Sequence, residues 1–336
     1  MASSSIHKYL FPQHPCFSGN LQLHKNSQVS SIHLASRVIR ACSAVSAEPD
    51  MNAKQGEILE AELFACPICY KPLMRKGTSG FNLKAINRSC FECETCRKSY
   101  SNNDVFLDLT VTAGMKKYKE VKPAGTEGFR NPLVSFVYER GFRQNLTLIG
   151  YPDIDEEFKM AQEFFERVKG GKMIDVSCGC GLFTRKFAKS DTYSHVVALD
   201  YSENMLRQCY EFIEQDETVP TNNLALIRAD VSRLPFESGS VDAVYAGVAI
   251  HCWPSPSNGV AEICRILQSG GVFAGSTSLR YSKSTPWYLR PMIERIFRGI
   301  NVFTEDEIED LLLSCGFTNY SSKVRGSYIM FSAQKP

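Results

Sequence analysis

The chain has 336 residues, enough for one large folded domain with smaller additions. Hydrophobic residues make up 43% and charged residues 22%, which argues against disorder as the main state of the chain. No uninterrupted apolar run approaches the ~20 residues that span a bilayer, so the sequence predicts that any membrane contact is peripheral.

Residues 1–47 differ in composition from the rest of the chain. They contain ten serines, four lysines or arginines and no acidic residue, and Glu48 is the first acid. This composition is typical of an organelle transit peptide, although a disordered tail without a targeting role is the alternative. The segment VIRAC at 38–42 resembles a chloroplast processing site, with cleavage near Ala41 or Cys42. Without this segment the chain has 34 basic and 36 acidic residues, which argues against a general affinity for nucleic acid.

Two C-x-x-C pairs lie in the segment 60–112, which is rich in cysteine, lysine and arginine. CPIC at 66–69 and CETC at 93–96 are separated by 23 residues. Thiolates in this pattern converge on a tetrahedral zinc ion, which replaces a missing core. We therefore predict a separate, small zinc-ribbon-like module with four ligands, Cys66, Cys69, Cys93 and Cys96.

The role of Cys90 stays open, because it forms an overlapping C-x-x-C pair with Cys93. A redox-active dithiol and a ribbon without metal are alternatives. The segment resembles the zinc ribbon in front of bacterial ribosomal-RNA guanine methyltransferases, which also begins CPxC; their second knuckle uses cysteine and histidine, so Cys96 is a departure. Between 66 and 100, seven basic residues outnumber two acids, which suits RNA, an anionic lipid surface or simply solvent.

A linker with a capping helix is expected over 113–154, followed by one domain over 155–336. A first helix is predicted over 155–169, and strands and helices alternate from 172 onward. The predicted strands are 172–177, 195–200, 224–230, 241–250, 270–278, 319–325 and 328–334, and the later helices are 182–190, 203–215, 260–267 and 304–315. This order predicts an α/β, doubly wound, mostly parallel sheet with an antiparallel C-terminal strand at or inside its edge.

The segment DVSCGCG at 175–181 joins the first of these strands to the next helix. Gly179 and Gly181 allow the backbone to approach a ligand closely, and the N-terminus of the following helix faces that ligand. Cys178 and Cys180 lack nearby ligand partners in the sequence, so we interpret them as bystanders rather than metal ligands.

Two acids follow the loop, each at the end of a predicted strand. Asp200 ends the next strand, 19 residues after Gly181, where a ribose-binding acid belongs, and Asp230 ends the third strand. Dinucleotide dehydrogenases have a third glycine where this chain has Thr184, and they lack an acid at the position of Asp175. An acid beside the loop favours a cationic ligand over a pyrophosphate by charge complementarity.

These residues resemble the class I S-adenosylmethionine-dependent methyltransferases, whose DxGxGxG loop corresponds to DVSCGCG with Ser177 in place of the first glycine. The resemblance covers about 155–335 and implies a Rossmann-like methyltransferase sheet. It implies that Asp200 binds the ribose hydroxyls and that Asp230 accepts from the adenine amino group. The cofactor-binding residues that it implies are Asp175, Ser177, Gly179, Gly181, Asp200, Tyr201, Met205, Asp230, Val231 and Gly247.

The segment AGVAIHCWPSP at 246–256 follows the fourth strand, where acceptor contacts cluster in this fold. His251 is the predicted catalytic residue, as a base or as a group that orients the acceptor, with structural packing as the alternative. Trp253 is expected to form a wall of the pocket. The segment is more similar to small-molecule and quinone C-methyltransferases than to RNA enzymes.

Taken whole, the chain resembles chloroplast methyltransferases of the quinone-biosynthesis-like group, some of which associate with plastoglobules. The resemblance implies an enzyme of the stroma or plastoglobule that methylates a small hydrophobic acceptor. Alternatives are a ribosomal-RNA base methyltransferase that uses the basic ribbon, and a cofactor-binding interaction module without turnover.

An apolar series at helical spacing lies within 280–303, interleaved with arginines: Trp287, Tyr288, Met292, Ile293, Ile296 and Phe297. It predicts either packing on the core or a lid over the acceptor pocket whose arginines contact plastid lipid droplets or the thylakoid.

Overall fold

A computed structural model describes residues 63–118, 128, 131–137, 145–283, 285–297 and 301–336. The transit peptide predicted for 1–47 and its cleavage site lie outside the described residues. From Leu63 onward, the described residues belong to one compact unit. Among them, no helix combines the length and the apolar character of a membrane span.

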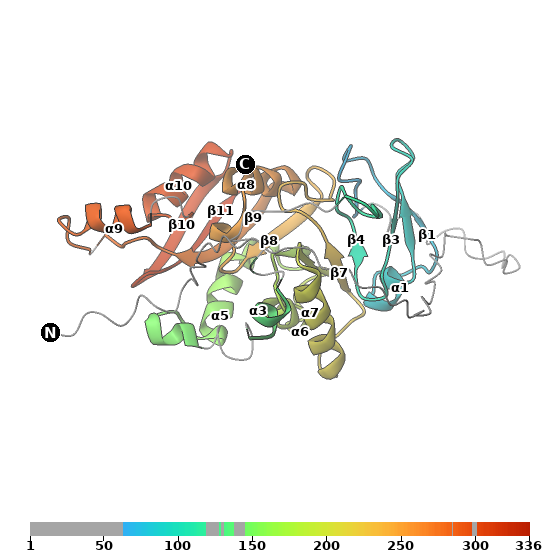
Figure 1. Ribbon diagram of the computed structural model, residues 1–336, viewed down its shortest axis with the longest axis horizontal. Coiled ribbons are helices and arrows are strands. Elements are labelled where there is room, and N and C mark those ends of the chain that lie inside the picture. The colour runs from blue at the N-terminus through green and yellow to red at the C-terminus, as the bar shows by residue number, and fades with distance from the viewer. Residues whose placement is uncertain (1–62, 119–127, 129–130, 138–144, 284, 298–300) are drawn as a thin grey trace, which may run out of the picture. The chain divides into compact units, whose positions relative to one another are not determined.

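An eight-stranded sheet forms the centre of the fold, with the strand order β10-β11-β9-β8-β5-β6-β7-β4 (Figure 1). Its central strands are parallel, as predicted, and a helix follows each of them except β7: β5 (Lys172–Val176), β6 (His195–Asp200), β7 (Leu224–Arg228), β8 (Val241–Ala246) and β9 (Leu267–Ser278). The closing strands β10 (Thr318–Arg325) and β11 (Tyr328–Gln334) pair antiparallel. Because β11 also pairs antiparallel with β9, an antiparallel strand lies inside the edge, which confirms the predicted architecture.

Helices cover both faces of this sheet (Figure 1). One face carries α5 (Ile154–Phe164), α6 (Leu182–Lys189) and α7 (Glu203–Gln215), and the other carries α8 (Pro256–Ile266) and α10 (Glu305–Ser314). Side-chain caps start several of these helices: Ser202 accepts a hydrogen bond at the start of α7, and Thr304 forms the predicted capping box at the start of α10. The short helices of the described residues include α3 (Pro132–Val137), η3 (Leu146–Ile149) and η4 (Glu166–Val168).

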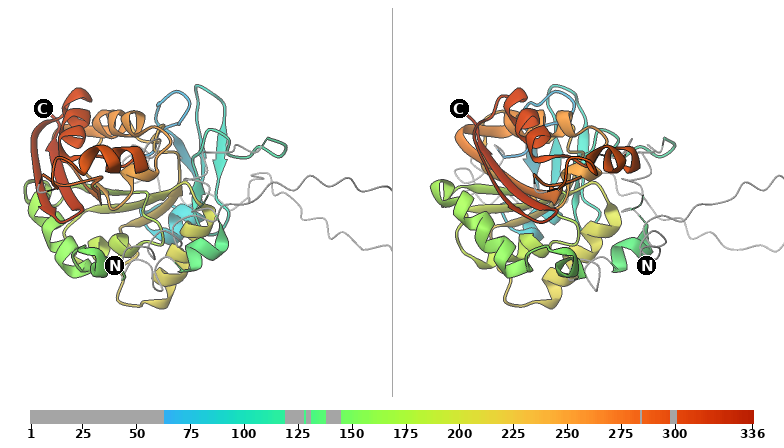
Figure 2. Two further views of the ribbon diagram at one scale, coloured as in Figure 1. Left: turned by 60° about the vertical axis from the view of Figure 1, so that its left-hand side comes forward. Right: turned by 90° about the vertical axis from the view of Figure 1, so that its left-hand side faces the viewer.

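The N-terminal module contains a three-stranded antiparallel sheet of β1 (Met74–Lys76), β2 (Cys90–Glu92) and β3 (Ser99–Ser101), with α1 (Leu83–Asn87) between its first two strands. Figure 2 shows this blue to teal segment from two further sides.

The N-terminal module packs against the larger domain. β4 (Leu107–Asp108), which follows it, pairs in parallel with β7 at the edge of the large sheet. Phe64 pairs with Phe236 of the larger domain, their ring centroids 6.0 Å apart. The module has too few apolar side chains for a core of its own, so it buries them against the larger domain.

Candidate functional site

The glycine loop lies between β5 and α6, at the carboxyl end of the central strand. Three of its residues have positive φ angles, namely Ser177 (57°), Gly179 (57°) and Gly181 (78°). A Cβ atom at Gly181 would lie 2.3 Å from the sulfur of Cys209 on α7, so the close packing of that helix requires glycine. The left-handed turn directs the chain from strand to helix over a short distance.

Ser177 stands where the methyltransferase motif has a glycine, and it keeps a glycine-like backbone conformation. Such a conformation costs a residue with a Cβ atom about 1–2 kcal/mol. Its Oγ accepts a hydrogen bond of 3.0 Å from the indole Nε1 of Trp253, a buried side chain. The hydroxyl therefore ties the loop to the wall formed by Trp253, a contact that glycine cannot make.

Asp200 ends β6 and reaches the glycine loop. Its Oδ2 accepts a hydrogen bond from the backbone N–H of Gly179 at 2.9 Å, and its Oδ1 accepts one from Ser202 at 2.7 Å. Burial raises the pKa of this carboxyl group, and these backbone donors oppose the rise by stabilising the carboxylate. Each carboxylate oxygen has two acceptor positions, so Asp200 can hold the loop and also accept from ligand hydroxyls.

A pocket opens beside the loop, at the carboxyl ends of the parallel strands. Its lining consists of Ser177, Gly179, Leu199, Asp200, Tyr201, Ser202, Met205, Ala229, Asp230, Val231, Gly247, Val248, Ala249, Cys252, Trp253 and Pro254. The structure thus brings together eight of the ten residues predicted to bind the cofactor, all except Asp175 and Gly181. The pocket combines two acids at strand ends, Asp200 and Asp230, with a wall from 247 to 254 that has no charged side chain in its lining.

Asp175 lies beneath the loop, outside the lining of this pocket. Its Oδ2 accepts a hydrogen bond of 2.5 Å from the hydroxyl of Thr184, and it lines a smaller recess that shares Ser177 with the pocket. Burial raises the pKa of Asp175 to about 7, although the bond from Thr184 opposes the rise. A cation bound nearby would therefore shift Asp175 towards its negatively charged form.

His251 lies in the short helix η5 (Ile250–Cys252), next to the pocket wall in the sequence. Its Nδ1 is 2.9 Å from the hydroxyl oxygen of Thr277 on β9. Burial lowers the pKa of the imidazole, so His251 is neutral near pH 7. The neighbouring Cys252 lines the pocket, whereas His251 is absent from the described lining.

Sequence reasoning missed Val248 in the pocket wall. Its φ angle is 53°, an unfavourable value for a β-branched residue. The backbone N–H of Val248 donates to Ser276 Oγ at 3.0 Å, and Ser276 donates in turn to the buried Glu157 at 2.7 Å. Because these partners come from β9 and α5, no local sequence signal reveals the turn.

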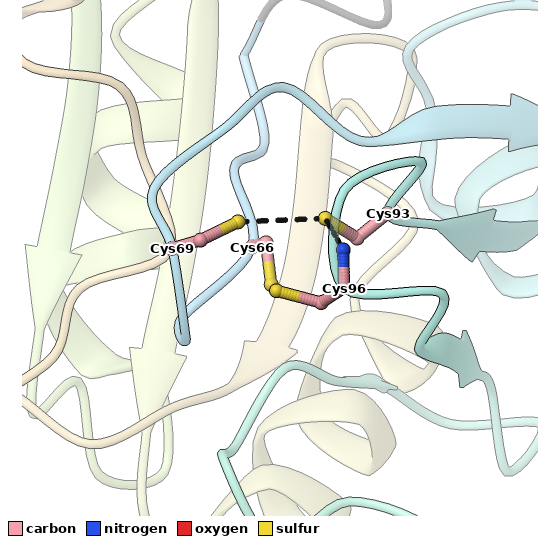
Figure 3. Close-up of side chains that lie close together, drawn as sticks. All are labelled: Cys66, Cys69, Cys93 and Cys96. Carbon is pink, nitrogen blue, oxygen red and sulfur yellow. Dashed lines mark hydrogen bonds between the residues drawn. The ribbon is translucent and has the colours of Figure 1, made fainter.

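The four predicted metal ligands converge in the N-terminal module (Figure 3). The sulfur atoms of Cys66, Cys69, Cys93 and Cys96 all lie within 4.8 Å of one another. Sulfurs around a tetrahedral zinc ion with bonds of about 2.3 Å are about 3.8 Å apart, so the cluster fits this metal. Among the described residues it is the one group of potential ligands of this kind, and the loop cysteines at 178 and 180 are outside it.

The two knuckles have the same backbone geometry. At Cys66 and at Cys93, the cysteine N–H donates to the carbonyl five residues later, at 2.9 Å in both. The N–H four residues later donates back to the cysteine carbonyl, from Tyr70 at 2.7 Å and from Arg97 at 2.8 Å. Both of these residues are left-handed, with φ angles of 58° and 56°. Cys90 takes no part, since it pairs within the sheet at the start of β2.

Comparison with known proteins identifies the domain around the pocket. A family model described as a methyltransferase domain matches residues 174–275. Two proteins of Arabidopsis thaliana, each named an uncharacterized chloroplastic methyltransferase, are 59% and 47% identical over 88% and 82% of this chain and 85% and 80% of theirs. A demethylmenaquinone methyltransferase of Staphylococcus haemolyticus is 34% identical over 31% of this chain and 41% of that protein.

A solved structure shares the fold. Phosphoethanolamine N-methyltransferase 2 of Haemonchus contortus, in complex with S-adenosyl-L-methionine, has a TM-score of 0.51 at 15% identity, over 65% of this chain and 61% of that one. The sheet order, the glycine loop and the long match to the two plant proteins lead to one conclusion. The chain belongs to the S-adenosylmethionine-dependent methyltransferase family.

Proposed function

We propose that this enzyme methylates a small, hydrophobic, quinone- or lipid-like acceptor in the chloroplast. The observation that carries the acceptor class is the pocket wall from 247 to 254, whose lining has no charged side chain. Such a wall favours an apolar ring or chain. The chloroplast is the compartment named for both plant relatives, and the staphylococcal relative is named for demethylmenaquinone.

In this proposal the strand-end acids hold the nucleoside of the cofactor. Asp200 accepts hydrogen bonds from both ribose hydroxyls, and Asp230 accepts one from the adenine amino group, beside the Val231 backbone. Tyr201 and Met205 flank the adenine, while the glycine loop lines the methionine moiety. Asp175 supplies negative charge beneath that loop. S-adenosylmethionine offers an electrophilic methyl group on a sulfonium, and alignment of the acceptor with it supplies much of the rate.

The acceptor class is tested with S-adenosylmethionine that carries a tritiated methyl group. The enzyme is incubated with chloroplast lipid extract in one reaction and with chloroplast ribosomal RNA in another. We expect label in the organic-extractable fraction. Label in the RNA, with none in the lipid fraction, would contradict the proposal.

Label in the RNA alone would support ribosomal-RNA base methylation, the other candidate function. The observation in its favour is a set of exposed basic residues on the N-terminal module: Lys71, Lys76, Lys84, Arg88 and Arg97. Exposed positive charge of this kind suits a phosphate backbone.

We also propose that His251 accepts a proton from the acceptor or orients it. When Nδ1 donates to Thr277, the lone pair on Nε2 is the proton acceptor. His251→Gln is expected to lower kcat about 100-fold and to leave the affinity for S-adenosylmethionine unchanged. Activity of the parent should fall only at a pH below the ordinary imidazole range, because burial lowers the pKa of His251 and a protonated imidazole cannot accept a proton, and the variant should lose this dependence. Superimposable pH–rate profiles would leave only a packing role.

The segment around α9 (Arg290–Ile296) does not pack on the core, since this helix has no buried residue. Its exposed apolar side chains are Trp287 (79%), Tyr288 (64%), Met292 (57%) and Ile296 (53%). Arg295 is exposed among them. We propose that this surface contacts the headgroup region of an anionic plastid lipid surface, where aromatic and basic side chains are favourable.

Replacing Trp287 and Ile296 together by serine is expected to reduce sedimentation with anionic vesicles about tenfold, because the apolar area that enters the interface is lost. Leu313→Ser, at an exposed apolar position of α10, is the control and should sediment like the parent. Equal sedimentation of the double variant and the parent would exclude this contact.

We propose, finally, that the four clustered cysteines bind one zinc ion. Four protein ligands leave no open position, so the ion would stabilise the module and take no part in methyl transfer.

A further inference from the structure

The first cysteine knuckle is hydrogen-bonded to a turn of the methyltransferase domain. Arg233 donates from Nε to the carbonyl of Pro67 at 2.6 Å and from Nη2 to the carbonyl of Ile68 at 2.9 Å. Its guanidinium also lies over the ring of Tyr70, 5.1 Å from the centroid. Both carbonyls stand between Cys66 and Cys69, so the position of Arg233 depends on the shape of the knuckle.

The same turn carries an acid of the cofactor pocket. The backbone N–H of Arg233 donates to the carbonyl of Asp230 at 2.9 Å, which closes a tight bridge between the two residues. The Asp230 carboxylate accepts from the backbone N–H of Ser232 at 2.9 Å and from its hydroxyl at 2.6 Å. A shift of Arg233 therefore moves the short turn that orients Asp230.

A second arginine links the module to the neighbouring pocket wall. Arg228, at the end of β7, binds Asp108 of β4 at 2.9 Å and donates from Nε to the carbonyl of Tyr201 at 3.1 Å. The guanidinium also lies over the Tyr201 ring, 5.2 Å from its centroid. A cavity lined on the module side by Thr110 and Thr112 shares Tyr201 with the cofactor pocket. The module thus supports the walls assigned to the adenine.

We infer that the metal-bound module positions Tyr201 and Asp230, so that zinc occupancy and cofactor affinity are thermodynamically linked. This inference rests on the zinc site and cofactor contacts proposed above. Without the metal, the thiolates of the first knuckle lose their common centre, and its carbonyls no longer fix Arg233. Linkage is reciprocal, so bound cofactor must tighten zinc binding by the same factor.

The residues that follow the turn of Asp230 and Arg233 have an independent support, which limits how far the loss of zinc weakens cofactor binding. Arg265 on α8 donates to the carbonyls of Leu234 and Phe236 at 2.8 Å each, and Glu262 accepts from the backbone N–H of Leu234 at 2.8 Å. Loss of the knuckle therefore displaces the turn around Asp230 and leaves the following residues in place. Couplings between sites are typically about 5- to 150-fold, and we expect the lower part of this range, about 5- to 20-fold.

The test measures the affinity of the full chain for S-adenosylhomocysteine by isothermal titration, with zinc bound and after its removal by a chelator. We expect binding to weaken about 5- to 20-fold on removal. Competition with a chromogenic chelator should show that saturating S-adenosylhomocysteine tightens zinc by the same factor. Arg233→Ala should retain one zinc ion per chain, yet bind S-adenosylhomocysteine with a weakened affinity that depends less on zinc than the affinity of the parent. Arg88→Ala, at an exposed position of the same module, should behave like the parent.

Equal affinities of the parent with and without zinc would overturn the linkage, and so would a zinc dependence in Arg233→Ala as large as that of the parent. If removal of zinc unfolds the chain, the test compares the S-adenosylhomocysteine affinities of the two variants with zinc bound. Equal affinities of Arg233→Ala and Arg88→Ala then overturn the inference. Failure of the zinc-bound parent to bind S-adenosylhomocysteine would instead overturn the proposed cofactor contacts. Absence of stoichiometric metal would overturn the zinc site itself.

Discussion

Asp200→Ala is expected to weaken S-adenosylmethionine binding by about 1–3 kcal/mol, which is about 5- to 150-fold in Kd. The carboxylate is the proposed acceptor for both ribose hydroxyls, and it also accepts the backbone N–H of Gly179. The substitution therefore removes charge-assisted hydrogen bonds to the ligand and loosens the glycine loop at the same time. Isothermal titration with S-adenosylmethionine measures the loss directly.

Asp155→Ala is the matched control, since this exposed acid of α5 pairs with Lys186 and lies outside the pocket lining. Asp200→Asn separates charge from shape, because an amide oxygen still accepts hydrogen bonds but carries no negative charge. Wild-type affinity in a correctly folded Asp200→Ala protein, judged by circular dichroism, would remove Asp200 from the proposed cofactor site.

Cys66→Ser is expected to release one zinc ion per chain and to loosen the module from about residue 63 to 110. Structural zinc supplies about 10–16 kcal/mol of apparent binding free energy in small zinc-finger peptides, so its loss outweighs most single contacts. Elemental analysis measures the metal, and amide hydrogen exchange over β1, β2 and β3 measures the loosening. The Phe64 and Phe236 contact should keep part of the segment packed on the larger domain.

Cys90→Ser is the internal control, because Cys90 lies in the same module but outside the sulfur cluster. The Cys90→Ser variant should keep the zinc ion and the slow amide hydrogen exchange of β1, β2 and β3. Equal loosening in the two variants would point to a sensitive β2 strand instead of metal loss, and metal-free protein prepared without chelator would contradict the zinc site.

The methyltransferase sheet could be predicted from the sequence because its signals are local. Short apolar runs mark the buried parallel strands, and Thr304 with Glu307 marks the start of α10 within four residues of chain. The glycine loop and Asp200 could be placed in one pocket for the same reason, since the carboxyl ends of neighbouring parallel strands meet at one edge.

The contacts that cross between elements could not be predicted in this way. The hydrogen bond between Trp253 and Ser177 joins residues 76 positions apart, and no periodicity encodes it. The edge strand β4 has two residues, too few for an alternating pattern, and its parallel pairing with β7 depends on the exposed edge of a sheet formed later in the chain. The predicted catalytic role of His251 rests on its residue type and on its place after the fourth strand, and neither signal gives the direction in which the imidazole ring points.

The pairing of β4 with β7 also bears on the order in which the chain folds. The Asp108 and Arg228 pair that secures it closes a loop of 120 residues, whereas the four cysteines lie within 66–96. Short loops close at lower entropic cost, and long-range strand pairing forms late. The four cysteines can therefore come together before β7 has been synthesised, while the edge on which β4 docks does not yet exist. The parallel pairing of β4 with β7 is then a late step, and until it forms the apolar side chains of the module lack the larger domain that covers them.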